Sequence, residues 1–306
     1  MRKRWSLALI LAVAITMLIS ACGGDTGGNA SNTPTAGSTL GKPGLTCVQG
    51  TLAVDGSSAL QPLVDAVAKD YQAKCSGANI TVQPGGSKKG LADVESGAVV
   101  IGNSDVFADA ATQADLVDHQ VAVVTFAVII NGKVGVKNLT TDQIKNIYAG
   151  KVTNWQDLGG PNKAITVVSR PTTSGTRATF QQLILGGPET ISGPASLTTD
   201  STATVIQNVG QTEGAIGYAA AFPASQNTDV ALVSLDGNAP TADLTKNNTY
   251  KFWNIEHMYT KGKPSDIAQA LLDYMASAQG KTILGQKGFI PLDAMTADAL
   301  ASHQPK

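Results

Sequence analysis

The stretch TLAVDGSSALQPLVDAVAKDYQAK, residues 51–74, decides the fold class. Its first five residues form a short apolar run of the strand type, and a Gly-Ser-Ser turn follows at residues 56–58. The remainder places Leu63, Val67 and Tyr71 at the spacing that lines one face of an α-helix. The stretch therefore predicts a strand, a tight turn and an amphipathic helix in succession.

The same alternation of apolar runs and helical segments continues toward the C-terminus. Strands that alternate with helices are typical of a mainly parallel sheet, because each crossover helix packs on a face of that sheet. The pattern predicts an α/β fold with helices on both faces. Further strands are predicted at residues 79–83, 98–105, 121–130, 164–170, 214–221 and 250–260.

The N-terminal residues have the composition of an export signal. A basic segment at residues 1–4 precedes an apolar run at residues 5–20, which predicts a signal peptide over residues 1–21. The sequence Ile-Ser-Ala-Cys then ends at Cys22 and resembles the site at which bacterial lipoproteins are cleaved and lipidated. An ordinary signal peptide with a chance cysteine is the alternative. Residues 22–45, rich in Gly, Ser, Thr and Asn, predict a flexible linker behind the lipid anchor.

The composition bounds the class of protein. The chain has 306 residues, of which 42% are hydrophobic and 15% charged, which is enough for a large core divided over two lobes. The formal net charge is −1 and there is no basic tract, so nucleic acid is not an expected partner. Apart from the leader, no apolar run approaches the length of a membrane span.

Two cysteines remain once Cys22 is assigned to the lipid, and both lie shortly before predicted strands. Cys47 precedes the strand at residues 51–55, and Cys75 precedes the strand at residues 79–83. Neighbouring parallel strands bring their starting ends together, so a disulfide between the two is reasonable in an exported protein. Two buried thiols are the alternative.

Three loops share one design, at residues 54–62, 83–94 and 169–180. Each runs from a strand through a Gly, Ser or Thr turn into a helix, which presents unpaired backbone N–H groups and hydroxyl groups at a positive helix end. Such an arrangement favours an anion. Helix capping explains any one of these loops by itself. Three of them at the carboxyl ends of strands favour a binding site, because ligands of open α/β sheets bind there.

Basic residues accompany two of these loops. Lys88 and Lys89 fall in the first turn of a helix, where a nearby anion would offset their charge, although simple solvation is the alternative. Arg170 supplies a planar fork of donors that suits a tetrahedral oxyanion. Residues 158–188 contain no Asp or Glu, so Arg170 has no acidic neighbour in sequence.

Asp105 ends the predicted strand at residues 98–105, at the same edge of the sheet. A carboxylate repels a fully ionised anion, but it accepts a hydrogen bond from an anion that carries a proton. A sulfate would leave two desolvated acceptors facing each other, at a cost of several kcal/mol. Asp105 therefore favours a protonated oxyanion such as phosphate, whereas a turn or cap role is the alternative.

Together these segments resemble the phosphate-binding proteins of bacterial ABC importers. The resemblance rests on Gly56-Ser57-Ser58-Ala59, Gly86-Ser87, Gly102-Asn103-Ser104-Asp105, and Arg170 four residues before Ser174-Gly175-Thr176. The second turn departs from the family by continuing into two lysines, and the first lacks a threonine–aromatic pair. The implied phosphate-binding residues are Ser58, Ala59, Ser87, Asp105, Arg170, Ser174, Gly175 and Thr176.

The resemblance also implies an architecture and a role. It implies a two-lobed type II periplasmic-binding-protein fold, each lobe a mostly parallel sheet flanked by helices, joined by two crossing strands. Lobe one would comprise residues 46–126 and 254–306, and lobe two residues 127–253. The protein would be an extracytoplasmic, lipid-anchored monomer that binds inorganic phosphate between the lobes. It would deliver the phosphate to the membrane subunits of an ABC permease, without a cofactor or metal.

Rival functions are weighed on the same residues. An extracellular serine hydrolase needs a base near its nucleophile, but His119, His257 and His303 lie outside any motif and no catalytic serine motif occurs. The same fold serving sulfate or molybdate has no use for Asp105. A phosphate-sensing surface protein is a further alternative that the residues do not distinguish from a transport protein.

Overall fold

The computed structural model describes residues 45–190 and 196–305. The predicted signal peptide, Cys22 and nearly all of the predicted linker lie outside the described residues. Within these two ranges no helix combines the length and the apolar character that a membrane crossing requires.

The described residues form strands and helices in the alternating order that the sequence predicts. The predicted strand, turn and helix of residues 51–74 correspond to β1 and α1. The strands are β1 (Gly50–Gly56), β2 (Ala78–Pro84), β3 (Ile101–Ser104), β4 (Leu116–Asn131), β5 (Asn138–Leu139), β6 (Thr166–Ser169), β7 (Ser196–Thr198), β8 (Ala215–Ala220), β9 (Val230–Leu235) and β10 (Trp253–Lys261). The helices are α1 (Gln61–Lys74), α2 (Ser87–Ser96), α3 (Thr141–Tyr148), α4 (Gly175–Phe180), α5 (Thr202–Gln211), α6 (Ala221–Ser225), α7 (Ala242–Lys246), α8 (Asp266–Ala276), α9 (Ala278–Gln286) and α10 (Ala297–Ala301), with single turns at Trp155–Leu158, Gln181–Leu185 and Leu292–Ala294.

The strands join in one sheet with the order β2-β1-β3-β10-β4-β8-β6-β7, while β9 pairs with β4 and β5. Pairing is parallel between β1 and its two neighbours and between β6 and its two neighbours. The long strand β4 is antiparallel to β10, β8 and β9, and β10 is antiparallel to β3. The sheet is therefore parallel in its outer parts and antiparallel at its centre.

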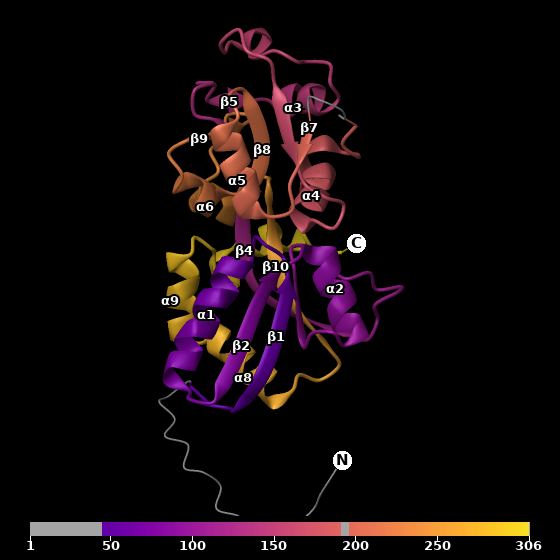
Figure 1. The fold of residues 1–306 in the computed structure, drawn as a ribbon, viewed down its shortest axis with the longest axis vertical. Helices are drawn as coiled ribbons and strands as arrows, with labels where there is room; N and C mark the ends of the chain where they lie inside the picture. The colour runs from indigo at the N-terminus through magenta and orange to yellow at the C-terminus, as the bar shows by residue number, and fades with distance from the viewer. Residues whose placement is uncertain (1–44, 191–195, 306) are drawn as a thin grey trace, which may run out of the picture. The chain divides into compact units, whose positions relative to one another are not determined.

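Strands β4 and β10 divide the elements into two groups, shown in Figure 1. We call β1–β3, α1, α2, α8 and α9 the β1 group, and β5–β9 with α3–α7 the β8 group. Because β4 leaves the β1 group and β10 returns to it, the two strands run in opposite directions. This reversal explains why the centre of the sheet is antiparallel.

Helix α1 shows how the apolar stripe forms the core of the β1 group. Leu63, Val67 and Tyr71 are all buried, as the helical spacing predicts. The helix packs against β2, α8 and α9. Burying a Leu or Val side chain contributes about 1.5–3 kcal/mol to folding, so this stripe holds the helix on the sheet.

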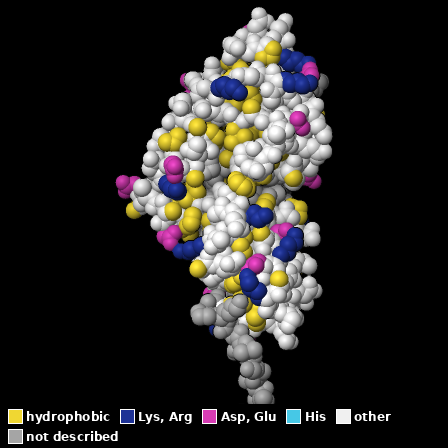
Figure 2. Space-filling view, turned by 90° about the vertical axis from the view of Figure 1, so that its left-hand side faces the viewer, with side chains coloured by type: hydrophobic (Ala, Val, Ile, Leu, Met, Phe, Trp, Pro, Cys, Tyr) yellow, Lys and Arg dark blue, Asp and Glu magenta, His cyan; other side chains and the backbone are white. Residues whose placement is uncertain are grey.

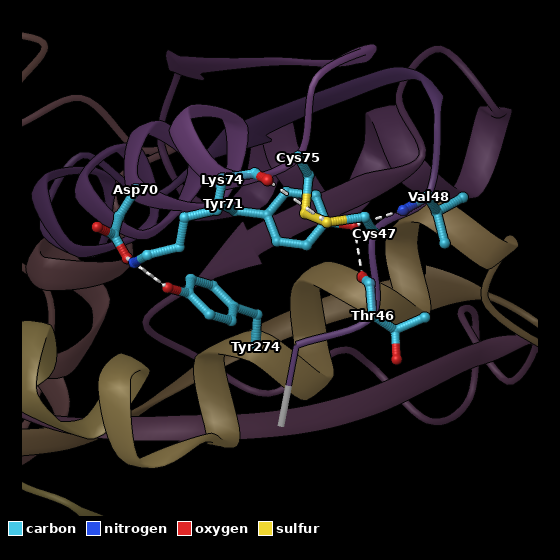
Figure 3. Close-up of a disulfide and its surroundings, with 8 residues drawn as sticks. All are labelled: Thr46, Cys47, Val48, Asp70, Tyr71, Lys74, Cys75 and Tyr274. Atoms are coloured by element: carbon cyan, nitrogen blue, oxygen red, sulfur yellow. Dashed lines mark hydrogen bonds and ion pairs between the residues drawn. A yellow bond between two sulfur atoms is a disulfide. The ribbon is translucent and has the colours of Figure 1, made fainter. Parts of the chain in front are cut away.

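The predicted disulfide is confirmed between Cys47 and Cys75, whose Cα atoms are 5.1 Å apart (Figure 3). It ties the segment before β1 to the end of α1. Beside it, the Tyr71 hydroxyl donates to the carbonyl of Thr46 and accepts from the N–H of Val48, both at 2.9 Å. The start of β1 is thus held by a covalent bond and by a buried tyrosine.

Candidate functional site

Backbone hydrogen bonds bring the three predicted anion loops together. The N–H groups of Gly85 and Gly86 both donate to the carbonyl of Gly56 at 2.8 Å, which joins the turn after β1 to the turn after β2. The N–H of Lys88 donates to the carbonyl of Thr173 at 3.1 Å, which joins the turn after β2 to the turn after β6. The loops therefore form one cluster, although Gly56 and Thr173 belong to different groups of elements.

Two glycines permit this close approach. Gly86 has a φ of +90°, and a Cβ there would lie 2.8 Å from the carbonyl oxygen of Thr173. A Cβ on Gly175 would lie 2.9 Å from Cβ of Asp105 and would also collide with the hydroxyl of Ser87. Real Cβ atoms do not approach so closely, so larger residues at these positions would push the loops apart.

Arg170 follows β6 and is only 1% exposed. Its Nη2 donates to the hydroxyl of Ser58 at 3.0 Å and to the carbonyl of Asp200 at 3.3 Å. Its Nε and Nη1 are buried and have no hydrogen-bond partner among the described residues. Burial lowers the pKa of the guanidinium, and the charge of Asp105 acts in the opposite direction. Two of the three guanidinium nitrogens therefore lack an acceptor among the described residues.

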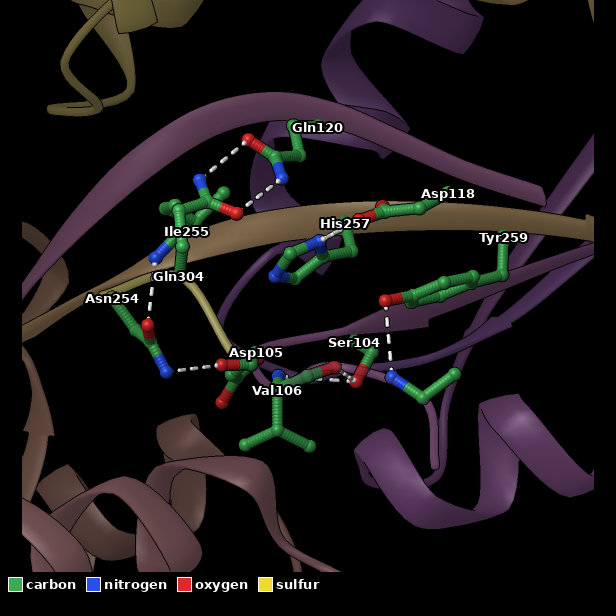
Figure 4. A network of polar contacts seen from close by, with 11 residues as sticks. Ser104, Asp105, Val106, Asp118, Gln120, Asn254, Ile255, His257, Tyr259 and Gln304 are labelled. Atoms are coloured by element: carbon green, nitrogen blue, oxygen red, sulfur yellow. Dashed lines mark hydrogen bonds and ion pairs between the residues drawn. The ribbon is translucent and has the colours of Figure 1, made fainter. Parts of the chain in front are cut away.

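Asp105 lies in the turn after β3 and is 2% exposed. Its Oδ1 accepts a hydrogen bond from the Ser57 hydroxyl, and its Oδ2 accepts one from the Thr176 hydroxyl at 2.8 Å. Its backbone N–H donates to the Ser87 hydroxyl at 2.9 Å. Its carbonyl accepts from Nδ2 of Asn254 at 2.7 Å, as Figure 4 shows. The carboxylate is thus fixed from both groups of elements.

The hydroxyl of Ser58 joins the two groups a second time. It accepts from Nη2 of Arg170 at 3.0 Å and from the N–H of Thr202 at 3.1 Å, at the start of α5. A hydroxyl has two lone pairs and one proton, so its proton is left to donate. The hydroxyl of Thr202, at 3.2 Å, is one acceptor within reach, and a bound anion is another.

The structure brings the predicted phosphate-binding residues into or beside this cluster. Ser174 caps α4 by accepting from the N–H of Arg177 at 3.2 Å, which leaves the preceding N–H groups of the helix start without intrahelical acceptors. Ala59 differs from the rest, because its N–H donates to the Ser57 hydroxyl at 3.1 Å and so has a partner within its own turn. The residues that meet here are Ser58, Ser87, Asp105, Arg170, Ser174, Gly175 and Thr176.

Several residues of the site were not expected from the sequence. Ser57 accepts from the N–H groups of Ala59 and Leu60 and donates to Asp105, so it locks the first turn onto the carboxylate. Thr202 and Asn254 contact Ser58 and Asp105 across long stretches of sequence. Only the serine at position 57 carried a local signal, since it lies in a Gly-Ser-Ser turn.

A second arginine supports Arg170 from behind. Nη1 of Arg177 donates to the carbonyl of Arg170 at 2.6 Å, and its Nη2 lies 3.4 Å from the carboxylate of Glu189. Glu189 in turn accepts from the hydroxyl of Tyr218 at 2.5 Å and from the hydroxyl of Ser169. Glu189, which pairs with Arg177, thus follows directly after the acid-free stretch at residues 158–188. Nε and Nη1 of Arg170 stay unpaired among the described residues.

The side chains of the paired lysines take no part in the cluster, although the backbone N–H of Lys88 joins two of its loops. Nζ of Lys89 lies 2.5 Å from the carboxylate of Asp55 and also pairs with Asp93, and these bonds raise its pKa. Lys88 is exposed. Their place in the first turn of α2 therefore needs no anion to explain it. Figure 2 shows basic side chains in small separate groups on one face of the molecule, with acidic side chains among them.

Among the described residues, the cluster combines several donors with the carboxylate of Asp105. The unpaired Nε and Nη1 of Arg170, the hydroxyl of Ser58 and the start of α4 favour a compact oxyanion. Asp105 accepts only, so the oxyanion must offer it a proton. No group of three or more His, Cys, Asp or Glu side chains within residues 45–190 and 196–305 is placed to hold a metal ion.

Comparisons with known proteins agree with this geometry. A family model described as a PBP superfamily domain matches residues 41–279. The chain is 41% identical over 305 residues to the phosphate-binding protein PstS of Bacillus subtilis (strain 168), a match that covers 98% of this chain and 98% of the relative.

Solved structures extend the comparison to the fold. A phosphate ABC transporter substrate-binding protein from Clostridium perfringens, solved with bound phosphate, has a TM-score of 0.75 and 28% identity over 79% of this chain and 100% of its own. An ABC-type phosphate transport receptor from Vibrio cholerae has a TM-score of 0.63 at 24% identity, which shows the fold alone. The type II periplasmic-binding-protein fold predicted from the sequence is confirmed. The chain therefore belongs to the PBP superfamily and, within it, to the family of the phosphate-binding protein PstS.

Proposed function

We propose that this protein captures inorganic phosphate between the β1 group and the β8 group and delivers it to an ABC permease. The observation that carries the proposal is the buried pairing of donor and acceptor in one cluster. Among the described residues, Nε and Nη1 of Arg170 have no partner, and Asp105 in the same cluster accepts from the hydroxyls of Ser57 and Thr176. The protein binds and releases its ligand and catalyses no reaction, as expected of a substrate-binding family.

The same contacts support a division into two lobes. We propose residues 46–126 with 254–306 as lobe one and residues 127–253 as lobe two, with β4 and β10 as the crossing strands. The hydrogen bonds of Asp105 with Thr176 and of Ser58 with Arg170 join these lobes at the ligand. An anion bound there contacts both lobes, so it favours the closed state that a permease recognises.

Phosphate is favoured over sulfate and molybdate by Asp105. A phosphate ion at neutral pH keeps at least one P–OH group, which the carboxylate can accept. A fully ionised oxyanion places a second acceptor against it in a buried site, at a cost of several kcal/mol. The relatives that carry phosphate in their names support the same choice.

The extracytoplasmic location and lipid anchor rest on the leader sequence and on the family. We place the mature protein outside the cytoplasm, anchored through lipid on Cys22 and acting as a monomer. Labelling cells with a radioactive fatty acid tests this, because wild-type protein should carry the label and Cys22→Ser should not. If neither the wild-type protein nor Cys22→Ser carries the label, the lipid anchor is ruled out, and the assignment of phosphate as the ligand is unaffected.

Binding of phosphate is tested directly by isothermal titration calorimetry of residues 45–306, with sulfate as the competing anion. We expect one phosphate per chain and no displacement of phosphate by a large excess of sulfate. If phosphate releases no heat and sulfate does, the assignment of phosphate as the ligand is wrong, and the assignment of the fold is unaffected. Uptake of radioactive phosphate in cells that lack the gene then separates transport from sensing, because only a transport protein restores it.

A further inference from the structure

The buried carboxyl group of Glu256 has no role in the site described so far. It lies on β10, its side chain is 0% exposed, and both oxygens lack a hydrogen-bond partner among the described residues. An isolated carboxylate buried in this way would be destabilised by many kcal/mol, so such a group either finds a partner or binds a proton.

Glu256 faces the anion cluster. Side chains two residues apart on a strand point to the same face, so Glu256 shares a face of β10 with Asn254, whose Nδ2 donates to the carbonyl of Asp105. In the antiparallel pairing of β10 with β3, His257 lies opposite Ser104, so the neighbouring residues Glu256 and Asp105 come next to each other at the end of this ladder. A register shift follows between Glu256 and His257, which ends this alternation next to the site.

Two facing carboxylates cannot bond to each other, because each only accepts. One proton between them removes the conflict, and the surroundings decide where it resides. Both oxygens of Asp105 already serve as acceptors, for the hydroxyls of Ser57 and Thr176. Glu256 accepts from no donor among the described residues. The proton therefore belongs to Glu256, and burial together with the charge of Asp105 raises the pKa of Glu256 well above its usual range.

The other titratable groups around β10 are engaged elsewhere. On β4, Oδ1 of Asp118 accepts from Nδ1 of His257 at 2.9 Å, and Nε2 of His119 lies 3.0 Å from the hydroxyl of Thr260. Lys89 of α2 pairs with Asp55 and Asp93. Asp105 is therefore the charged group of the described residues that acts on Glu256.

We propose that Glu256 is a positioning residue that stays protonated, donates its carboxyl proton to Asp105, and thereby holds that carboxylate in place for the proton of the bound anion. The proposal rests on the function proposed above. A protonated Glu256 that donates to Asp105 predicts a pH dependence of phosphate binding, which a residue that only fills space in the core would not cause. When Glu256 loses its proton to solvent, a second negative charge appears beside Asp105 and the ligand, so affinity for phosphate falls at alkaline pH.

The decisive comparison is between wild-type protein and Glu256→Gln, with phosphate affinity measured by calorimetry from acidic to alkaline pH. A glutamine amide keeps donating to Asp105 at every pH and cannot ionise. Changes in the protonation of phosphate affect both proteins alike, so the ratio of the two Kd values isolates Glu256. We expect a ratio near one at acidic pH, and a wild-type Kd that rises relative to the variant by up to about tenfold per pH unit above the pKa of Glu256.

Proton uptake on phosphate binding gives a second readout on the same samples. At alkaline pH the wild-type protein should take up more protons on binding phosphate than Glu256→Gln does, as heats in buffers of different ionisation enthalpy reveal. Parallel pH profiles and equal proton uptake would overturn the inference while leaving the phosphate site intact. Absence of phosphate binding by the wild-type protein at every pH would instead overturn the proposed function.

A measurement on the wild-type protein alone keeps the inference testable if Glu256→Gln fails to fold. Infrared spectroscopy at neutral pH should show the C=O stretch of a protonated carboxylic acid in a buried site, and titration to alkaline pH should remove it. A spectrum without that band at neutral pH would show that Glu256 is ionised, and the inference would fall.

Discussion

The hydroxyl of Thr176 donates a hydrogen bond of 2.8 Å to Oδ2 of Asp105, a residue 71 positions earlier in the chain. One residue begins α4 and the other follows β3, so the bond joins the two groups of elements. The bond from Arg170 to Ser58 joins them again over a separation of 112 residues. Both bonds use side chains that we propose to bind the anion, and on that proposal ligand binding and closure of the two groups are energetically linked.

Removing the guanidinium of Arg170 should abolish most phosphate binding. Its unpaired Nε and Nη1 offer at least two charged hydrogen bonds, each contributing about 1.5–3 kcal/mol, so Arg170→Ala should raise the Kd by about a hundredfold or more. Calorimetry measures the change. Lys163→Ala is the matched control, because Lys163 is a basic residue shortly before β6 that pairs with Glu213 at 2.7 Å. An unchanged Kd in a folded Arg170→Ala protein would disprove the assignment.

Exchanging the carboxylate of Asp105 for an amide should relax selectivity. The amide of Asp105→Asn can donate to a fully ionised oxygen, so sulfate should begin to compete with phosphate. The measurement is displacement of radioactive phosphate by sulfate. If wild-type protein already binds both anions equally well, Asp105 does not read the proton of the ligand.

Ser57→Ala should loosen the carboxylate without removing any proposed ligand contact. The variant loses the donor to Asp105 and the acceptor for the N–H groups of Ala59 and Leu60. We expect about a tenfold weaker Kd for phosphate and a loss of about 1–3 kcal/mol in unfolding free energy. Ser96→Ala is the control, since Ser96 is exposed and bonds only to the carbonyl of Asp93. Equal effects of the two substitutions would show that Ser57 has no special role.

Loss of the disulfide should affect stability and leave ligand binding unchanged. The bridge between Cys47 and Cys75 closes a loop with a sequence separation of 28 and lies at the far end of α1 from the cluster. Replacing both cysteines by serine should lower the unfolding free energy by about 3–4 kcal/mol, measured by denaturant titration. A large change in phosphate Kd at a temperature where the variant is folded would contradict this separation.

The raised pKa of Glu256 also predicts how stability depends on pH. In the unfolded chain, Glu256 loses its proton near the ordinary carboxyl pKa of 4.5, whereas the folded protein keeps this proton to a higher pH. Folding therefore takes up a proton, and this contribution to stability is lost as pH rises from 4.5 to the folded pKa. Relative to Glu256→Gln, the wild-type protein should become progressively less stable over that interval in denaturant titrations. A difference that stays constant with pH would mean that Glu256 is ionised in the folded state.

The sequence by itself determined the features that depend on neighbouring residues. The helical spacing of Leu63, Val67 and Tyr71 predicted α1, because periodicity along a short segment decides which face is buried. The Ser-Gly-Thr motif at residues 174–176 predicted a helix start with donors, because capping is local. The positions of the two cysteines before neighbouring strands favoured a disulfide over two buried thiols, and the structure contains that bond.

Only the tertiary structure decided how distant side chains share their protons and charges. The sequence predicted a mainly parallel sheet. The antiparallel pairing of β4 with β10 arises because β4 leads from the β1 group to the β8 group and β10 leads back. Both arginines stand in one acid-free stretch, yet Arg177 has an acidic partner in Glu189. Nε and Nη1 of Arg170 have no partner among the described residues. Glu256 reads as an ordinary strand residue until folding buries it against Asp105. Hydrogen-bond partners and burial depend on three-dimensional neighbours, which local periodicity does not encode.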